Sequence, residues 1–176
     1  MDRLSPIRYW PRSVKKLILI FVGVAFIGVV FGAVFIEVTT HLTPQGVVEQ
    51  YKGISESRVD NAEELKFPKP LKEMLTTTHN HILGLSSLFV IVGFLYLHVG
   101  NQEAWRLFVA VEPLISLILT FGGLWVMRYL WSPFVYVVII SGALMVGTYA
   151  WMSIAIMKEC ISKRVISDEY RQKEIS

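Results

Sequence analysis

The sequence is poor in charged residues and in cysteine. The first shortage argues against a soluble globular domain, and the second excludes a disulfide-linked fold. Charged residues make up 18% of its 176 residues, against about a quarter in a soluble globular domain. They gather at the two ends and in one central stretch, with long uncharged runs between them, as expected where lipid is the main solvent. The one cysteine, Cys160, excludes an internal disulfide.

Motifs that would indicate a familiar catalytic or transport site are also absent. The chain has no glycine-rich phosphate loop, no C-x-x-C or C-x-x-C-H motif and no H-E-x-x-H motif. No internal repeat is visible, which argues against an inverted-repeat transporter. The net charge of +3 comes from basic residues that flank apolar segments, a pattern of membrane anchoring. We therefore expect no nucleic-acid partner, and a non-catalytic or electron-transfer subunit rather than a stand-alone enzyme.

Four apolar segments are each long enough to cross a bilayer as a helix. The first lacks the short apolar region and small-residue cleavage site of a signal peptide, so we expect it to be retained. Short turns follow the second and third, so these segments would pack as antiparallel neighbours. The sequence thus predicts an all-α integral membrane protein with an up-down four-helix bundle. The predicted transmembrane helices span residues 17–41, 75–98, 104–128 and 132–157.

Lysine and arginine set the predicted orientation through the positive-inside rule. Eleven of the 17 basic residues lie in the N-terminal tail (1–16), in the C-terminal tail (158–176) or at Arg106, and six lie on the other side. An even number of spans puts both tails on one side, so we expect both termini in the cytoplasm. The expected location is a multi-pass position in a bacterial inner (plasma) membrane.

The one sizeable loop, residues 42–74, would face the periplasm or the outside. Thr43 and Pro44 fit an N-cap and a first helical position, and Gly53 fits a C-terminal stop. The apolar residues between them share one helix face. We predict a short amphipathic helix on the membrane surface. The loop is too short for an enzyme domain and would serve as a lid or a docking surface.

Three of the four histidines gather at the outer ends of the first two predicted spans. Glu37 and His41 are four residues apart and share a helix face, and His79 and His81 follow a run of threonines. Imidazole binds Fe, Cu and Zn, and two histidines can hold a b-type haem. These four residues predict a site for haem b or a transition metal ion. Histidines that only hydrogen-bond headgroups, water or loop carbonyls are the alternative.

Helical geometry ranks these ligands. Residues two apart point about 200° apart on a helix, and His79 lies in line with Ser86 and Gly93. Small and polar residues line helix contacts in membrane bundles, so we expect His79 to face the bundle. His79 and His41 are then the preferred ligands, and His81 ranks third. Arg128, at the outer end of the third span, would pair with Glu37 or a haem propionate, or snorkel to headgroups.

A second polar group lies toward the cytoplasmic side. Glu112 sits within the third predicted span, where a carboxylate is costly and marks a functional site by default. Ser116 continues its face into the bundle interior, and His98 and Tyr149 are its predicted partners. This group would form a proton path or contact a quinone headgroup. The alternative is one interhelical hydrogen bond made by a protonated Glu112.

Three functions remain open from the sequence. The first is a membrane subunit that binds haem b or a metal ion at its outer face and belongs to an electron-transfer complex. The second is a non-catalytic accessory or assembly subunit, and the third is a small oligomeric channel or carrier lined by Glu112. Gly28 and Gly32 form a small-residue contact motif. This motif favours other membrane or periplasmic subunits, or a homo-oligomer, as partners besides the lipid bilayer.

Overall fold

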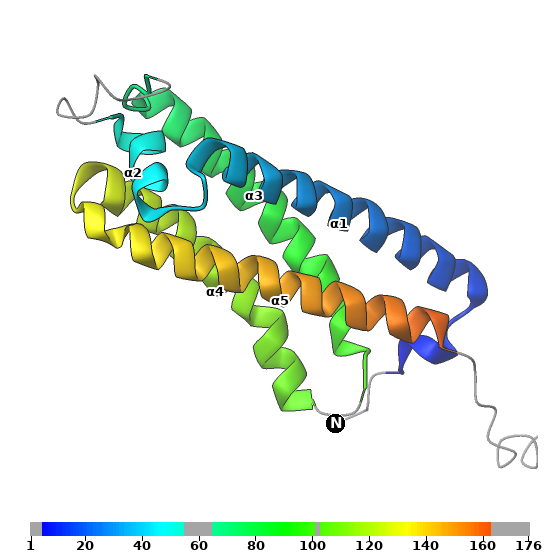
Figure 1. Cartoon of the computed structure of the whole chain (residues 1–176). Helices are drawn as coiled ribbons and strands as arrows, with labels where there is room; N and C mark the ends of the chain where they lie inside the picture. Colours follow the sequence, from blue (N-terminus) through cyan, green and yellow to red (C-terminus); the bar gives the residue numbers. More distant parts are fainter. Residues whose placement is uncertain (1–4, 55–64, 101–102, 163–176) are drawn as a thin grey trace, which may run out of the picture.

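The chain is all-helical over residues 5–54, 65–100 and 103–162, which are the residues that the computed structural model describes (Figure 1). Four of the helices are long and apolar enough to cross a membrane. The predicted all-α membrane fold with four transmembrane helices is thereby confirmed. In chain order, the elements are η1 (Ile7–Tyr9), α1 (Arg12–Thr40), α2 (Pro44–Lys52), α3 (Leu71–Leu97), α4 (Glu103–Tyr129), η3 (Ser132–Phe134) and α5 (Val135–Ile161).

Prolines mark the starts of two long helices. Pro11 and Pro70 are the N-cap residues of α1 and α3, and both have extended backbone angles. A proline at this point disfavours helical angles in the residue before it and so fixes where the helix starts. The helices therefore begin several residues before the spans expected from hydropathy. Hydropathy marks the lipid-facing part of a helix, whereas the proline marks its first turn.

The two ends of the described chain lie at the same end of the bundle, as an even number of spans requires (Figure 1). Arg8 Nε is 2.7 Å from Glu159 Oε1, near the end of α5. The backbone N–H of Ile7 donates to the carbonyl oxygen of His98, directly after α3, over 3.1 Å. We call this the inner end. The opposite end, which carries α2, is called the outer end.

Helix α4 is the centre of the bundle, and it packs between α3 and α5. Half of the most apolar stretch of α4 is buried, against 11% for that of α1. Small residues bring the backbones together. A Cβ added to Gly93 on α3 would lie 3.3 Å from the Cβ of Ala110, and one added to Gly123 would lie 3.0 Å from Val138 on α5. The core of the protein therefore follows both faces of α4.

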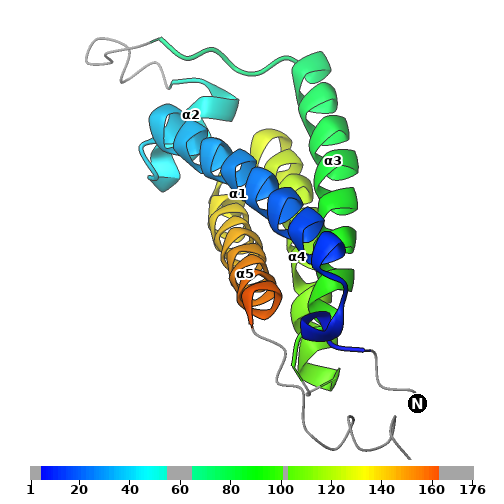
Figure 2. The same ribbon diagram turned by 90° about the vertical axis from the view of Figure 1, so that its right-hand side faces the viewer.

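Helix α1 crosses this three-helix core at an angle and packs mainly against α5 (Figure 2). Its inner half contributes the buried side chains of Ile18 and Val22. Residues 31–38 of its outer half are all exposed. A Cβ added to Gly28 or Gly32 would meet no other atom within 4 Å. The small-residue motif of α1 therefore contacts nothing within the described part of the chain.

The short helix α2 forms as predicted, but it packs onto the outer ends of α4 and α5 as well as lying beside α1. Thr43 Oγ1 accepts a hydrogen bond from the N–H of Gly46 over 2.9 Å and caps the helix. A Cβ at Gly46 would lie 1.9 Å from the carbonyl oxygen of Thr40, so only glycine allows this close turn. Lys52 Nζ donates to Ser132 Oγ over 2.8 Å and ties α2 to η3. The outer loop is thus anchored to the bundle and does not lie on the membrane alone.

Candidate functional site

The outer histidines do not point as the sequence analysis expected. Both His79 and His81 are exposed, but the ring of His81 packs on Phe121 of α4, with the ring centroids 5.1 Å apart. His81 therefore faces α4 and His79 does not, which reverses the predicted order. A straight helix drifts by about 20° per heptad. This drift is too small to explain the difference. At the outer end the face of α3 that meets α4 carries Thr78 and His81, which are three residues apart and contact Trp125 and Phe121 of α4.

The predicted outer ligands do not come together as one set. Glu37, His41 and His79 are all exposed. Among residues 5–54, 65–100 and 103–162, no three His, Cys, Asp or Glu side chains are grouped so as to hold a metal ion. A haem or metal site at the outer end therefore stays a prediction.

Arg128 does not pair with Glu37 within the described part of the chain. Its Nη2 lies 3.5 Å from the carbonyl oxygen of Lys69, and its guanidinium stands 5.0 Å from the centre of the Tyr129 ring. Its buried Nε has no hydrogen-bond partner among the described residues. Arg128 thus holds the segment before α3 against the end of α4. A contact with a haem propionate remains an untested prediction.

A line of polar side chains runs through the bundle between α4 and α5. Glu112, Ser116 and Thr120 follow one another at four-residue steps on α4, so they share one helix face. Ser116 Oγ donates a hydrogen bond to Glu112 Oε1. Farther toward the outer end, Thr120 Oγ1 and Ser141 Oγ on α5 are 2.7 Å apart. Since Ser141 donates to the carbonyl oxygen of Val137, the proton between the two hydroxyls comes from Thr120.

The helix contacts fix which residues lie at the same depth. Gly93 packs on Ala110, and Trp125 Nε1 donates to Thr78 Oγ1 over 2.9 Å, so α3 and α4 run antiparallel in one register. The Thr120–Ser141 contact sets the register of α4 against α5 in the same way. On a rise of about 1.5 Å per residue, these pairs place Glu112 level with Tyr149. Ser153 follows one turn closer to the inner end.

Three buried polar atoms near this depth make no hydrogen bond of good geometry within the described residues: Glu112 Oε2, Tyr149 Oη and Ser153 Oγ. The side chains of Tyr149 and Ser153 nevertheless interact with each other, so the Oε2 atom of Glu112 is the one of the three without any partner there. The side chains of Tyr149 and Ser153 are fully buried. An unsatisfied buried polar group costs about 1–3 kcal/mol, and native proteins rarely leave several close together. These three groups, which lie within about one helical turn of one another in depth, are the candidate functional site, because their donors and acceptors can hold water, a proton or a polar ligand.

The predicted partners of Glu112 are placed differently from one another. Tyr149 lies at the level of Glu112, and a contact between the two stays a prediction. His98 lies about two turns closer to the inner end, beyond direct reach of the carboxyl group. It is 7% exposed, and its Nδ1 lies 3.0 Å from the carbonyl oxygen of Phe94. Ser153 lies at the depth between the two.

Three hydroxyl residues of this line were not predicted from the sequence: Thr120, Ser141 and Ser153. Each is a small polar residue in an apolar helix, which alone is an ordinary feature of a membrane helix. The feature of the sequence that could have revealed these residues is their spacing along the helices. Ser141, Tyr149 and Ser153 recur in steps of four or eight residues on α5, as Glu112, Ser116 and Thr120 do on α4. Two polar faces with the same periodicity on adjacent spans would have indicated a shared polar interior.

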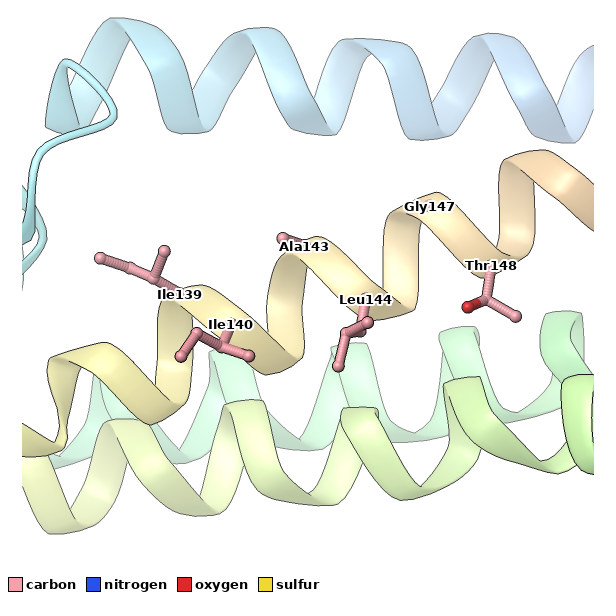
Figure 3. Close-up of a pocket in the computed structure, with 6 residues that line it drawn as sticks. All are labelled: Ile139, Ile140, Ala143, Leu144, Gly147 and Thr148. Atoms are coloured by element: carbon pink, nitrogen blue, oxygen red, sulfur yellow. The ribbon is translucent and has the colours of Figure 1, made fainter.

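An open groove of about 450 Å³ runs along α5, whose residues alone line it (Figure 3). Its single polar side chain is that of Thr148, at the inner end of the groove. A groove with this lining offers no group for acid–base chemistry, so the interior polar line remains the candidate site. The lining residues are Ile139, Ile140, Ala143, Leu144, Gly147 and Thr148.

Comparison with known proteins supports the membrane assignment. A family model described as a transmembrane helical domain matches residues 41–166. The matched range takes in α2, α3, α4 and α5, and with them the whole interior polar line. No curated protein and no solved structure matches the chain.

Proposed function

We propose that this chain relays protons through its bundle, with Glu112 taking up and releasing the proton. The chain belongs to the Aq_1264_TM family of transmembrane helical domains. The observation that carries the proposal is the hydrogen bonding of the two carboxyl oxygens of Glu112. Its Oε1 accepts a hydrogen bond from Ser116, while its buried Oε2 has no partner among the described residues. A carboxyl group at this depth is costly and marks a functional site by default.

The residues around Glu112 have the chemistry that a relay needs. A hydroxyl group donates one hydrogen bond and accepts others at the same time, so a row of hydroxyls passes a proton by switching its bonds. Toward the outer end, the row continues through Ser116 to the Thr120–Ser141 pair. Toward the inner end, it continues to Tyr149 and Ser153. Bridging water would connect groups that are too far apart for a direct bond.

A purely structural role explains only part of this arrangement. Interhelical hydrogen bonds stabilise membrane bundles, and the Thr120–Ser141 contact serves that purpose. The buried Oε2 atom of Glu112 has no partner within the described residues, so packing alone does not explain it. Selection for packing alone would favour an apolar side chain of similar volume at this position, since replacing a buried polar group in that way is often neutral or stabilising.

Proton flux into liposomes tests the relay. The purified chain is reconstituted with a pH-sensitive dye inside, and a potassium gradient with valinomycin sets the membrane potential. We expect proton flux above that of protein-free liposomes. Glu112→Gln keeps the shape and an acceptor for Ser116 but carries no exchangeable acid proton, so the flux should fall to the protein-free level. Glu112→Asp should retain part of it.

The matched control is Glu49→Gln, which makes the same chemical change on α2, outside the four spans. It should leave the flux unchanged. The relay is ruled out if the reconstituted protein conducts no more than empty liposomes, or if Glu112→Gln conducts as well as the unmodified chain. A low flux in both glutamine variants would indicate general damage, which circular dichroism of the same samples would reveal.

A second candidate is an electron-transfer subunit with haem b, or Fe, Cu or Zn, bound at the outer end. It is supported by the orientation of His81, whose Nδ1 lies 2.8 Å from the carbonyl oxygen of Thr77. When Nδ1–H donates to that carbonyl, Nε2 keeps a free lone pair, as in histidines that ligate metals. His81 would supply one ligand. His41, His79, Glu37 or a partner subunit would have to supply the rest.

Absorption spectra of the oxidised and reduced protein, with elemental analysis, test this second candidate. A reduced haem band or a near-stoichiometric metal content is expected, and His81→Ala should abolish it. Preparations that are colourless and metal-free, from cells that supply both, would exclude the cofactor. The accessory-subunit interpretation would then stand beside the proton relay.

A further inference from the structure

The N-terminal segment folds back onto the inner end of the bundle. Ile7 is completely buried, and its backbone N–H donates to the carbonyl oxygen of His98 over 3.1 Å. The next residue, Arg8, is paired through Nε with Glu159 of α5 at 2.7 Å. One short segment is therefore fixed to the end of α3 and to the end of α5, which are the two helices that flank α4.

Trp10 covers the side chain of His98. The two rings meet edge to face with their centroids 5.0 Å apart, and Phe94 packs on His98 in the same manner at 4.9 Å. Trp10 Nε1 also donates to the backbone and side-chain oxygens of Ser5, over 3.2 and 3.1 Å. These bonds close residues 5–10 into a compact loop. The His98 imidazole is thus enclosed between Trp10 and Phe94.

His98 follows α3 at the inner end, at a depth about one turn beyond Ser153. Its Nδ1 is directed at the carbonyl oxygen of Phe94, so Nε2 remains for exchange with other groups. The charged groups near it are held by other contacts. Arg8 pairs with Glu159, Lys15 Nζ donates to the carbonyl oxygen of Arg8 over 3.3 Å, and Arg106 donates to the carbonyl oxygen of Leu97.

We propose that residues 5–10 are a gate over the inner end of the proton relay, closed in this structure, with Trp10 as the side chain that shields His98. When the segment detaches, His98 meets the water on the inner side and exchanges protons between that water and Ser153. This inference rests on the proposed relay, and it assigns the relay an inner terminus and a means of control.

The segment has the properties of an element that can open. The polar contacts that hold it to the helices include the Ile7–His98 backbone hydrogen bond, the Arg8–Glu159 ion pair and the hydrogen bond from Lys15 to the carbonyl oxygen of Arg8, beside the packing of Ile7 and Trp10. The side chain of Arg8 in that ion pair is 37% exposed, and such pairs hold weakly. Elements with few buried contacts and exposed hydrogen bonds open locally while the rest of a protein stays folded.

Chemical modification of the histidines tests the shielding without any measurement of flux. Diethyl pyrocarbonate acylates accessible neutral imidazoles, and mass spectrometry reports each site. His41 is exposed and serves as the internal reference. In the unmodified chain, His98 should react far more slowly than His41. Trp10→Ala should bring the rate at His98 close to that at His41. Trp105→Ala, which removes an exposed tryptophan from α4, should leave His98 protected.

Proton flux in liposomes tests the gating. Trp10→Ala should conduct faster than the unmodified chain, and Trp10→Ala combined with Glu112→Gln should conduct no more than protein-free liposomes. Arg8→Gln is a milder variant that breaks the ion pair. It should also raise the proton flux. The control is Arg12→Gln, which removes the same charge from the exposed start of α1 and should leave the flux unchanged.

The two readouts separate the gate from the relay. If His98 becomes reactive in Trp10→Ala but the flux stays at the unmodified level, the segment is no gate, and the relay stands on the Glu112→Gln result. If His98 already reacts as fast as His41 in the unmodified chain, the shielding is wrong. If no variant conducts protons, the proposed function fails and the gate with it, whatever the modification shows.

Discussion

The hydroxyl oxygens of Thr120 and Ser141 lie 2.7 Å apart at the contact between α4 and α5. Both side chains are buried, and their bond is a polar contact at the centre of the packed core. It fixes the register of the two helices and, in the proposed relay, continues the row of hydroxyls that begins at Glu112. The proposed relay thus gives this bond a functional role beside its structural one, and the two can be measured separately.

Thr120→Val should destabilise the bundle slightly and reduce proton flux strongly. Valine keeps the shape of threonine, so the change removes the hydroxyl and leaves the packing in place. Interhelical hydrogen bonds in membrane proteins contribute about 0.6 kcal/mol on average and at most about 1.7 kcal/mol. Reversible unfolding in mixed micelles measures the loss of stability.

A double-mutant cycle with Ser141→Ala isolates the pair. The coupling energy should be of the order of the average above, because the two hydroxyls bond to each other. Additive effects of the two substitutions would show that the hydroxyls do not interact. Normal flux in Thr120→Val would remove Thr120 from the relay while leaving its structural role intact.

Gly93→Val should destabilise the contact of α3 with α4. An added Cβ at Gly93 would lie 3.3 Å from both the Cβ and the carbonyl oxygen of Ala110, and valine adds two more methyl groups. Overpacking of this kind costs about 1–3 kcal/mol. The control is Gly84→Val on the same helix, where an added Cβ meets no atom within 4 Å. Equal unfolding free energies for the two variants would contradict the packing of α3 on α4.

Tyr51 on α2 should ionise above the usual range of tyrosine. Burial, and then the nearby carboxylate of Glu73, raise its pKa from an ordinary value of about 10. The difference in ultraviolet absorbance between the unmodified chain and Tyr51→Phe, followed as the pH rises, isolates this one phenol. A midpoint at or below the ordinary value would show that α2 is not packed as described.

The same shift has a consequence for stability. An unfolded chain would lose the Tyr51 proton near pH 10, and the folded chain loses it at a higher pH. The stability linked to this group is therefore fully present below pH 10 and is lost as the pH rises through the folded pKa. Glu73→Gln removes the smaller cause, so it should lower the midpoint only in part.

Much of the fold could be predicted from the sequence, because a bilayer imposes few solutions on an apolar chain. Backbone groups must be satisfied within the membrane, so an apolar run such as residues 17–36 has to be helical. The cap formed by Thr43 and Pro44 could be recognised in the same way, since it depends only on neighbouring residues. The docking of α2 on η3 could not, because Lys52 and Ser132 are far apart in the sequence.

The candidate site was harder to predict because side-chain direction depends on neighbouring helices. Glu112 stood out as the one carboxyl group within its span. Ser153 and Ser141 gave no such signal, since serine is an ordinary residue in a membrane helix. The orientation of His79 and His81 was predicted from one helix alone, and it was wrong because the face of α3 that meets α4 at the outer end carries His81 and not His79.

The glycine motif of α1 leads to the last prediction. Gly28→Ile and Gly32→Ile should leave the stability of a single chain nearly unchanged, within about 0.5 kcal/mol, since an added Cβ meets nothing at either position. If a second copy or another subunit packs against this face, as the motif predicts, the same substitutions should dissociate it. Light scattering of the detergent-purified protein reports both the mass and its change. An oligomer that survives both substitutions would show that α1 is not the contact. A loss of stability without any change in mass would instead mean that α1 packs on its own bundle more closely than in this structure.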